Sequence, residues 1–268
     1  MRDIALVASY PRSGNSWTRV MLACYLTAGP IRSRDTLDDL VPDLHQLLSG
    51  GSLLPPDDLR PAIVKTHFPP RAEVHQPYRP FARKILYLVR NPRDIVFSYM
   101  RLLHIEGGYR RQFAKDFIAN RGGTNIHKQL GIWPQHVRDW TSPDGIHECF
   151  PNVTGIQVIK YEDMRADPAR QLRLILEFLD IDDKVEPDRL GIALENSSLE
   201  KMRAMEEVER RSGPNMYRDR PAPVRFIHQG LTGQSLASLG EDVEAAYQHL
   251  LRDDEEFSRC VKRFGYAG

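Results

Sequence analysis

The chain has 268 residues, which is long enough for one large α/β domain with a substantial core. Its 37 lysine and arginine residues balance 36 aspartate and glutamate residues, so the composition gives no reason to expect binding to nucleic acid or to an anionic membrane. The three cysteines are widely spaced and form no CxxC pair, which indicates neither a zinc site nor a redox dithiol.

The first residues enter an apolar pattern almost at once, and no apolar run in the chain approaches the roughly 18 residues that a membrane span needs. We therefore expect no signal peptide, no membrane segment and a cytoplasmic protein.

Short apolar runs predict four β-strands, at residues 4–9, 62–65, 84–89 and 155–161. Helical patterns follow these runs, and Pro92 behind the capping residue Asn91 marks one helix start. Apolar strands that alternate with helices predict an α/β domain of three layers, a central parallel sheet flanked by helices. We expect residues 1–268 to form one domain, in which residues 104–150, rich in arginine, glycine and aromatic residues, form a mobile cover over a site.

The stretch SYPRSGNSW, residues 9–17, joins the first strand to the first helix. Gly14 lets the loop turn tightly, and its neighbours add hydrogen-bond donors where a helix N-terminus attracts anions. The loop lacks the Gly-Lys-Ser/Thr of a nucleoside triphosphate site and offers no evident metal ligand; Trp17 follows instead. Trp17 either stacks on a nucleobase or is buried in a purely structural turn.

The second strand ends in VKTHFP, which places Lys65 and His67 at the edge where open α/β sheets bind ligands. His67 is the candidate general base, because imidazole titrates near neutral pH. A hydrogen-bonded surface histidine is the alternative interpretation.

The third strand leads into VRNPRDIVFSYM. Arg90 and Ser98 lie eight positions apart and are candidates for binding a second phosphate, Arg90 through its bidentate fork. We interpret Arg93 and Asp94 as structural, because an acidic residue in the first turn stabilises the helix dipole.

The motifs YPRSGNSW, KTH, VRNPRDIVFSY and YEDM occur in an order and spacing that resemble the cytosolic-type sulfotransferases, and the chain looks like a bacterial member. These enzymes use 3′-phosphoadenosine 5′-phosphosulfate (PAPS) and no metal. The resemblance spans about residues 4–205. It implies a three-layer α/β fold whose P-loop-like loop binds the phosphosulfate.

The resemblance also implies roles for single residues. His67 would be the base, and Arg12 and Lys65 would stabilise the charge that develops during sulfuryl transfer, with Arg12 acting electrostatically because arginine does not donate its proton. The implied nucleotide contacts are Ser13, Gly14, Asn15 and Ser16 on the 5′-phosphate, Trp17 and Tyr161 on adenine, Arg90 and Ser98 on the 3′-phosphate, and Ser197 near the nucleotide.

The chain departs from the family near its C-terminus. The family carries an RKGxxGDW segment that grips the 3′-phosphate, whereas this chain has HQGLTGQS at 228–235. Gly230 persists and its N–H is a candidate phosphate donor, but His228 and Gln229 replace the basic pair. Either donor affinity is weaker or other arginines substitute, with candidates at Arg218, Arg220 and Arg225. The dimer signature of animal members is absent, so the oligomeric state stays open.

The implied activity is transfer of a sulfuryl group from PAPS to a hydroxyl group of a small molecule such as a phenol, an alcohol or a natural product. A carbohydrate acceptor, a small-molecule kinase and a nucleotide-binding regulator are the alternatives. The aromatic residues available for an apolar acceptor pocket are Phe68, Tyr78, Tyr109, Phe113, Trp133 and Trp140. Trp133 and Trp140 are equally suited to the core, since seven residues place them on one helical face.

Overall fold

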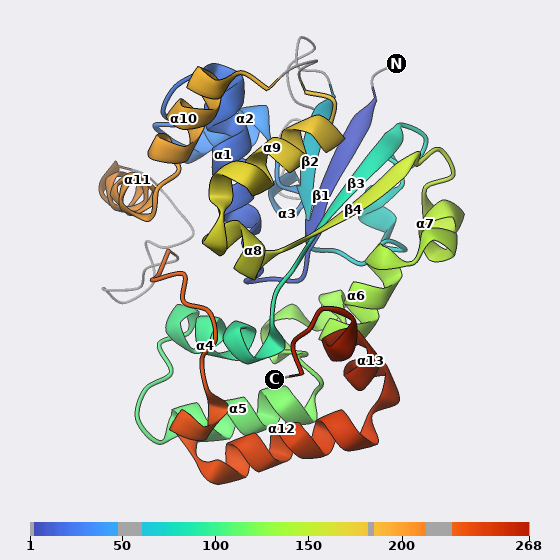
Figure 1. Cartoon of the computed structure of the whole chain (residues 1–268), viewed down its shortest axis with the longest axis vertical. Coiled ribbons are helices and arrows are strands. Elements are labelled where there is room, and N and C mark those ends of the chain that lie inside the picture. Colours follow the sequence, from blue (N-terminus) through green and yellow to red (C-terminus); the bar gives the residue numbers. More distant parts are fainter. Residues whose placement is uncertain (1–2, 48–60, 182–184, 213–226, 268) are drawn as a thin grey trace.

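The computed structural model describes residues 3–47, 61–181, 185–212 and 227–267. It contains one sheet of four parallel strands in the order β2-β1-β3-β4 (Figure 1). The strands are β1 (Ile4–Ser9), β2 (Ala62–Thr66), β3 (Ala82–Val89) and β4 (Gly155–Lys160). All four predicted strands and the parallel sheet are confirmed.

The side chains of β1 alternate between two hydrophobic clusters, one on each face of the sheet. Leu6 and Ala8 pack into one cluster, and Ala5 and Val7 pack into the other. Because a strand covered on both faces must be apolar throughout, this explains the unbroken apolar run of residues 4–8. The chain continues from β1 to β2 on one side and reaches β3 on the other, so the carboxyl ends of these strands meet at a switch point in strand order.

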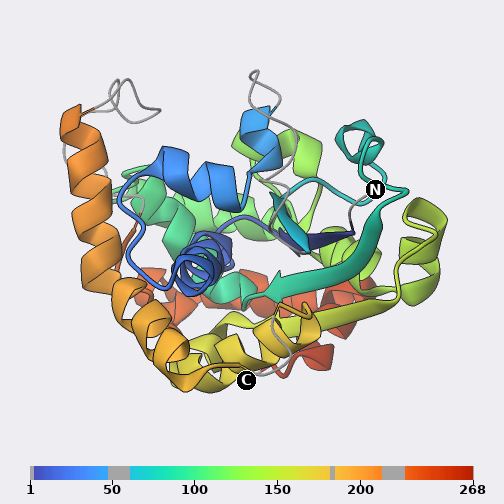
Figure 2. The same cartoon turned by 90° about the horizontal axis from the view of Figure 1, so that it is seen from above.

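The helices form the two outer layers, as predicted. One layer contains α1 (Asn15–Thr27), α2 (Arg34–Leu40), α8 (Tyr161–Ala166), α9 (Pro168–Phe178), α10 (Pro187–Asn196) and α11 (Leu199–Ser212). The other contains α4 (Pro92–Leu102), α5 (Tyr109–Ala119), α6 (Trp133–Thr141), α7 (Pro143–Cys149), α12 (Glu241–Asp253) and α13 (Glu255–Arg263). Figure 2 shows α10 and α11, in orange, along one flank of the molecule.

Shorter helices connect these elements. They are α3 (Leu44–Leu47) and the 3-10 helices η1 (Glu73–His75), η2 (Asn125–Leu130) and η3 (Leu236–Leu239). No helix in the described ranges combines the length and the apolar composition that crossing a bilayer requires.

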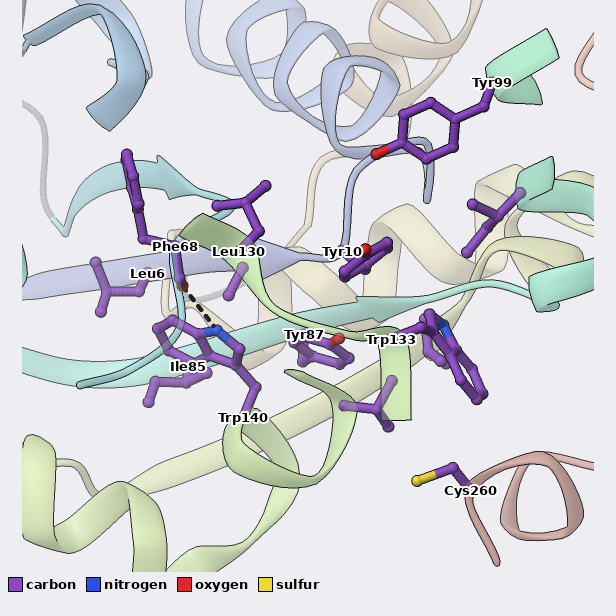
Figure 3. Packing of buried hydrophobic residues seen from close by; sticks show 14 of the residues in the cluster. Leu6, Tyr10, Phe68, Ile85, Tyr87, Tyr99, Leu130, Trp133, Trp140 and Cys260 are labelled. Atoms are coloured by element: carbon purple, nitrogen blue, oxygen red, sulfur yellow. Dashed lines mark hydrogen bonds between the residues drawn. The ribbon is translucent and has the colours of Figure 1, made fainter. Parts of the chain in front are cut away.

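The two tryptophans of α6 belong to the core. Trp133 and Trp140 are fully buried, and the indole of Trp140 donates a hydrogen bond to the Phe68 carbonyl at 3.0 Å (Figure 3). These two side chains anchor α6 in the core, and the mobile cover at residues 104–150 stays a prediction. The tryptophans do not line an acceptor pocket: they and Tyr78 are core residues, while Tyr109 is 81% exposed.

Candidate functional site

The loop after β1 reaches α1 through two residues in the left-handed region of backbone conformation. Arg12 has φ of 70° and Gly14, the N-cap of α1, has φ of 96°. This geometry turns the chain so that α1 begins immediately behind the loop, and Asn15 and Ser16 face a cavity there. The N-terminus of α1 is consequently directed at the cavity, where it favours an anion.

Gly14 also packs against the ring of Tyr161 at the start of α8. A Cβ added to Gly14 would lie 2.6 Å from the Tyr161 ring carbon Cδ2. The position therefore needs glycine for two reasons, its positive φ and the closeness of the ring.

We expect Gly14→Ala to destabilise the fold by about 1–3 kcal/mol, because alanine is strained in the left-handed region and its methyl group displaces Tyr161. Thermal and urea denaturation measure this loss. Gly191→Ala is the matched control: Gly191 lies within α10 and nothing surrounds its added Cβ within 4 Å, so its substitution should leave stability unchanged or raise it. Equal stability of the two variants would contradict the packing argument.

The loop faces a cavity at the carboxyl edge of the sheet, with about 780 Å³ of empty space that is partly open to solvent. Four arginines line it, and among the described lining residues there is no aspartate or glutamate. The predicted residues that line it are Arg12, Gly14, Asn15, Ser16, Trp17, His67, Arg90, Ser98, Tyr161, Ser197, His228 and Gly230. Of the predicted catalytic and nucleotide-binding residues, all but Ser13, Lys65 and Gln229 thus line one cavity.

Arginine side chains hold the loop and α4 together at one end of the cavity. The Nε of Arg12 donates to Ser98 Oγ at 2.9 Å, and Nη1 of Arg90 donates to the Arg12 carbonyl at 2.7 Å. The Arg90 guanidinium also lies 4.2 Å from the centre of the Tyr161 ring, in a cation–π contact. These contacts concentrate positive charge between β1, β3 and α4.

Aromatic rings form another wall of the cavity. The Trp17 indole donates to the Ser197 carbonyl at 3.0 Å, and its ring meets the Tyr161 ring edge-on at 6.2 Å. Arg165 lies over the Trp17 ring at 5.5 Å. Trp17 is therefore partly buried and also lines the cavity, and its stacking on a nucleobase stays a prediction.

His67 is held in one tautomer. Its Nδ1 lies 2.7 Å from the Ser9 carbonyl, and because a carbonyl only accepts, Nδ1 carries the proton and Nε2 has a lone pair. Burial lowers the pKa of His67 well below 6.5, and the positive charge of Lys65 lowers it further. At neutral pH the ring is uncharged and able to accept a proton at Nε2.

Lys65, the second predicted residue of this strand end, does not line the cavity. Its ammonium donates to Asp43 Oδ2 at 2.8 Å, and both side chains are buried. Desolvation is the largest effect on the Asp43 pKa and raises it, but Lys65 and Arg19 more than offset it and hold that pKa below its usual range. Burial lowers the Lys65 pKa to about 8, against the opposing attraction of Asp43. Lys65 is therefore committed to a buried ion pair, and its role in stabilising developing charge stays a prediction.

The C-terminal segment 227–235 crosses the cavity and docks on α4. Main-chain N–H groups of Gly233 and Gln234 donate to the Asp94 carboxylate at 3.0 and 2.9 Å. Asp94 is thus structural, as predicted, although through this contact and not through the helix dipole alone. His228 and Gly230 line the cavity, whereas Gln229 is exposed and does not.

Ser13 differs from expectation, and three further candidates lie outside the described residues. Ser13 is buried beside the cavity lining and its Oγ has no hydrogen-bond partner. The substitute arginines considered from the sequence, Arg218, Arg220 and Arg225, lie outside the described residues.

Sequence reasoning missed two arginines of the lining, Arg101 and Arg165. Arg101 follows Ser98 by three residues on a helix, which places both on one face, and Arg165 follows Tyr161 by four in the same way. This helical spacing could have identified both arginines from the sequence. Asp43 was missed as well, and no local pattern marks it, because its partner lies in a distant segment.

Comparison with known proteins gives a consistent result. A family model described as "Sulfotransferase domain" matches residues 2–252. Mouse sulfotransferase 1A1 is 28% identical over 194 residues, which cover 66% of this chain and 60% of the mouse protein. Bovine sulfotransferase 1A1 is 26% identical over 245 residues, which cover 86% of this chain and 76% of the bovine protein. The chain therefore matches only about 60% of the length of the mouse relative.

Two solved structures share the fold. Mouse sulfotransferase SULT7A1 complexed with PAP superposes with a TM-score of 0.60 at 19% identity, over 100% of this chain and 89% of that one. Retinol dehydratase in complex with androsterone and inactive cofactor PAP gives a TM-score of 0.59 at 20% identity, over 95% of this chain and 82% of that one. At these identities the likeness establishes the fold.

Proposed function

The chain belongs to the sulfotransferase family, and we propose that it transfers a sulfuryl group from PAPS to a hydroxyl group of a small molecule. The observation that supports this proposal is the composition of the cavity, in which four arginines and no described carboxylate face a helix N-terminus. Such a lining favours a ligand with several negative charges.

The residues present suit an adenosine nucleotide with phosphate groups at both the 3′ and the 5′ position of its ribose. Trp17 and Tyr161 offer ring faces for adenine, and positive charge from Arg12 and Arg90 lies beside them. Two buried polar atoms beside this space, Ser13 Oγ and Arg90 Nε, have no hydrogen-bond partner. A bound phosphate group would supply acceptors for them.

In the proposed reaction PAPS supplies the sulfuryl group, and the chain supplies a base and fixed positive charge. His67 accepts the proton of the acceptor hydroxyl at Nε2, because its Nδ1 proton is committed to the Ser9 carbonyl. Arg12 keeps a permanent cation at the phosphate loop, where negative charge grows on the leaving group. Its hydrogen bond to Ser98 fixes the guanidinium before the reaction begins.

The acceptor is proposed to be a flat hydroxyl compound such as a phenol. The ring of His45 stacks on Phe68 at 4.2 Å and lies 5.9 Å from the ring of His67. Burial, followed by the charge of Lys65, lowers the pKa of His45 to about 4, so this surface carries no charge at neutral pH. An uncharged aromatic surface beside the base favours an aromatic acceptor.

Calorimetric titration with adenosine 3′,5′-bisphosphate, ADP and ATP, each with and without Mg²⁺, tests the donor assignment. We expect the bisphosphate to bind in the micromolar range without Mg²⁺ and more tightly than ADP, because the arginines neutralise its phosphates directly. Tighter binding of ATP in the presence of Mg²⁺ would overturn the proposal and favour a kinase.

A further inference from the structure

The segment 228–235 encloses one side of the cavity without providing a charged side chain. Its place over the cavity is fixed by the Asp94 contacts and by Arg90, whose Nη2 donates to the Leu231 carbonyl at 2.7 Å. His228 does not restore the missing charge by titrating. Burial lowers its pKa to about 4, and the neighbouring cations Arg12 and Arg101 lower it as well. Any charge at this end of the cavity must come from another element.

Arg101 of α4 is in position to supply that charge. It lines the cavity one helical turn after Ser98, and its Nη1 donates to the side-chain carbonyl of Gln234 at 2.9 Å. Its Nε is buried without a partner, as is the Nε of Arg90. Two guanidinium groups with buried, unpartnered nitrogen atoms therefore face one cavity.

Among the described residues, the positive charges near Arg101 outnumber the negative ones, because Arg90 and Arg110 repel it and Asp94 attracts it. Burial lowers the pKa of Arg101, and repulsion from Arg90 lowers it further, while Asp94 attracts it. Both oxygens of Asp94 also accept N–H groups of the docked segment, so this carboxylate makes its hydrogen bonds to that segment. An anion with two negative charges, bound where these arginines line the cavity, would relieve their repulsion.

We propose, on the basis of the proposed function, that Arg101 together with Arg90 binds the 3′-phosphate of the donor, in place of the basic pair that is absent at 228–229. In this chain the positive charge lies on the side of α4 that lines the cavity and not on segment 228–235, where the family carries it. Gln234 holds the Arg101 side chain in place. Arg101 is then the residue that distinguishes a 3′-phosphorylated nucleotide from one without that group.

The experiment compares the affinities of adenosine 3′,5′-bisphosphate and 5′-AMP, which differ only in the 3′-phosphate, by calorimetry on wild type and Arg101→Gln. In the variant we expect the preference for the bisphosphate to fall by about 10- to 100-fold, the range for a hydrogen bond to a charged group, with 5′-AMP affinity unchanged. Arg101→Lys should restore part of the preference, since it restores the charge without the fork.

Arg111→Gln is the control for loss of charge alone, because Arg111 pairs with Asp242 on the exposed surface and does not line the cavity. It should leave both affinities and their ratio close to the wild-type values. An Arg101→Gln variant that keeps the wild-type ratio, or that weakens both nucleotides equally, would overturn the inference. If wild type itself shows no preference for the bisphosphate, the proposed function fails instead, so the two failures are distinguishable.

Discussion

His67→Gln is expected to lower kcat for sulfuryl transfer to a phenolic acceptor by about 10²- to 10⁴-fold, the range that a positioned proton acceptor contributes. Glutamine is close in size and keeps a donor for the Ser9 carbonyl, but it has no basic nitrogen at the position of Nε2. Steady-state kinetics measures the loss. Binding of adenosine 3′,5′-bisphosphate, followed by calorimetry, should persist, because the proposed phosphate contacts come from other residues.

The pH dependence of wild-type kcat provides an independent check on His67. Since burial and the charge of Lys65 lower its pKa well below 6.5, the imidazole remains unprotonated as the pH falls through that value. The kcat plateau should therefore extend below pH 6.5. His249→Gln, on the exposed face of α12, is the control and should leave kcat unchanged. Turnover of His67→Gln near the wild-type rate would contradict the assignment of His67 as the general base.

Asp43→Asn is expected to destabilise the fold by about 3–5 kcal/mol, because it leaves the buried ammonium of Lys65 without a counter-ion. Urea denaturation at neutral pH measures the difference. The deficit should shrink at alkaline pH, since Lys65 already has a pKa of about 8 with Asp43 present, and losing the attraction of Asp43 lowers it further. A deprotonated Lys65 no longer needs a partner.

Two controls separate this effect from a general loss of charge. Adding Lys65→Met to Asp43→Asn removes the stranded charge and should recover much of the stability. Asp3→Asn breaks an exposed pair with Arg83, at 3.0 Å, and should cost less than about 1 kcal/mol. If Asp43→Asn costs no more than Asp3→Asn, the Asp43–Lys65 pair does not stabilise the fold in the manner described.

The sequence predicted the sheet and the site because both depend on local patterns. Apolar runs located the strands, and the loop at 9–17, the end of β2 and the end of β3 each carried polar residues at a carboxyl edge. In a parallel sheet these edges meet, so His67 and Arg90 line one cavity although they are far apart from Arg12 in the chain.

What the sequence could not predict depends on contacts between distant segments. Nothing near Asp43 in the chain indicates that its carboxylate pairs with Lys65, and nothing near Asp94 indicates that it binds the C-terminal segment. Trp133 and Trp140 show the same limit: their spacing fits a buried face or a pocket wall equally well, and only the packing of α6 against the sheet distinguishes the two.

The ring of Tyr161 separates two parts of the cavity wall that come from opposite ends of the chain. An added Cβ at Gly14 would lie 2.6 Å from its Cδ2, and one at Gly230 would lie 2.9 Å from its hydroxyl oxygen. Tyr161 therefore lies between the loop at 9–17 and the docked segment and contacts both. Its ring keeps these two parts of the wall apart, so a smaller side chain at this position is expected to change the spacing between them.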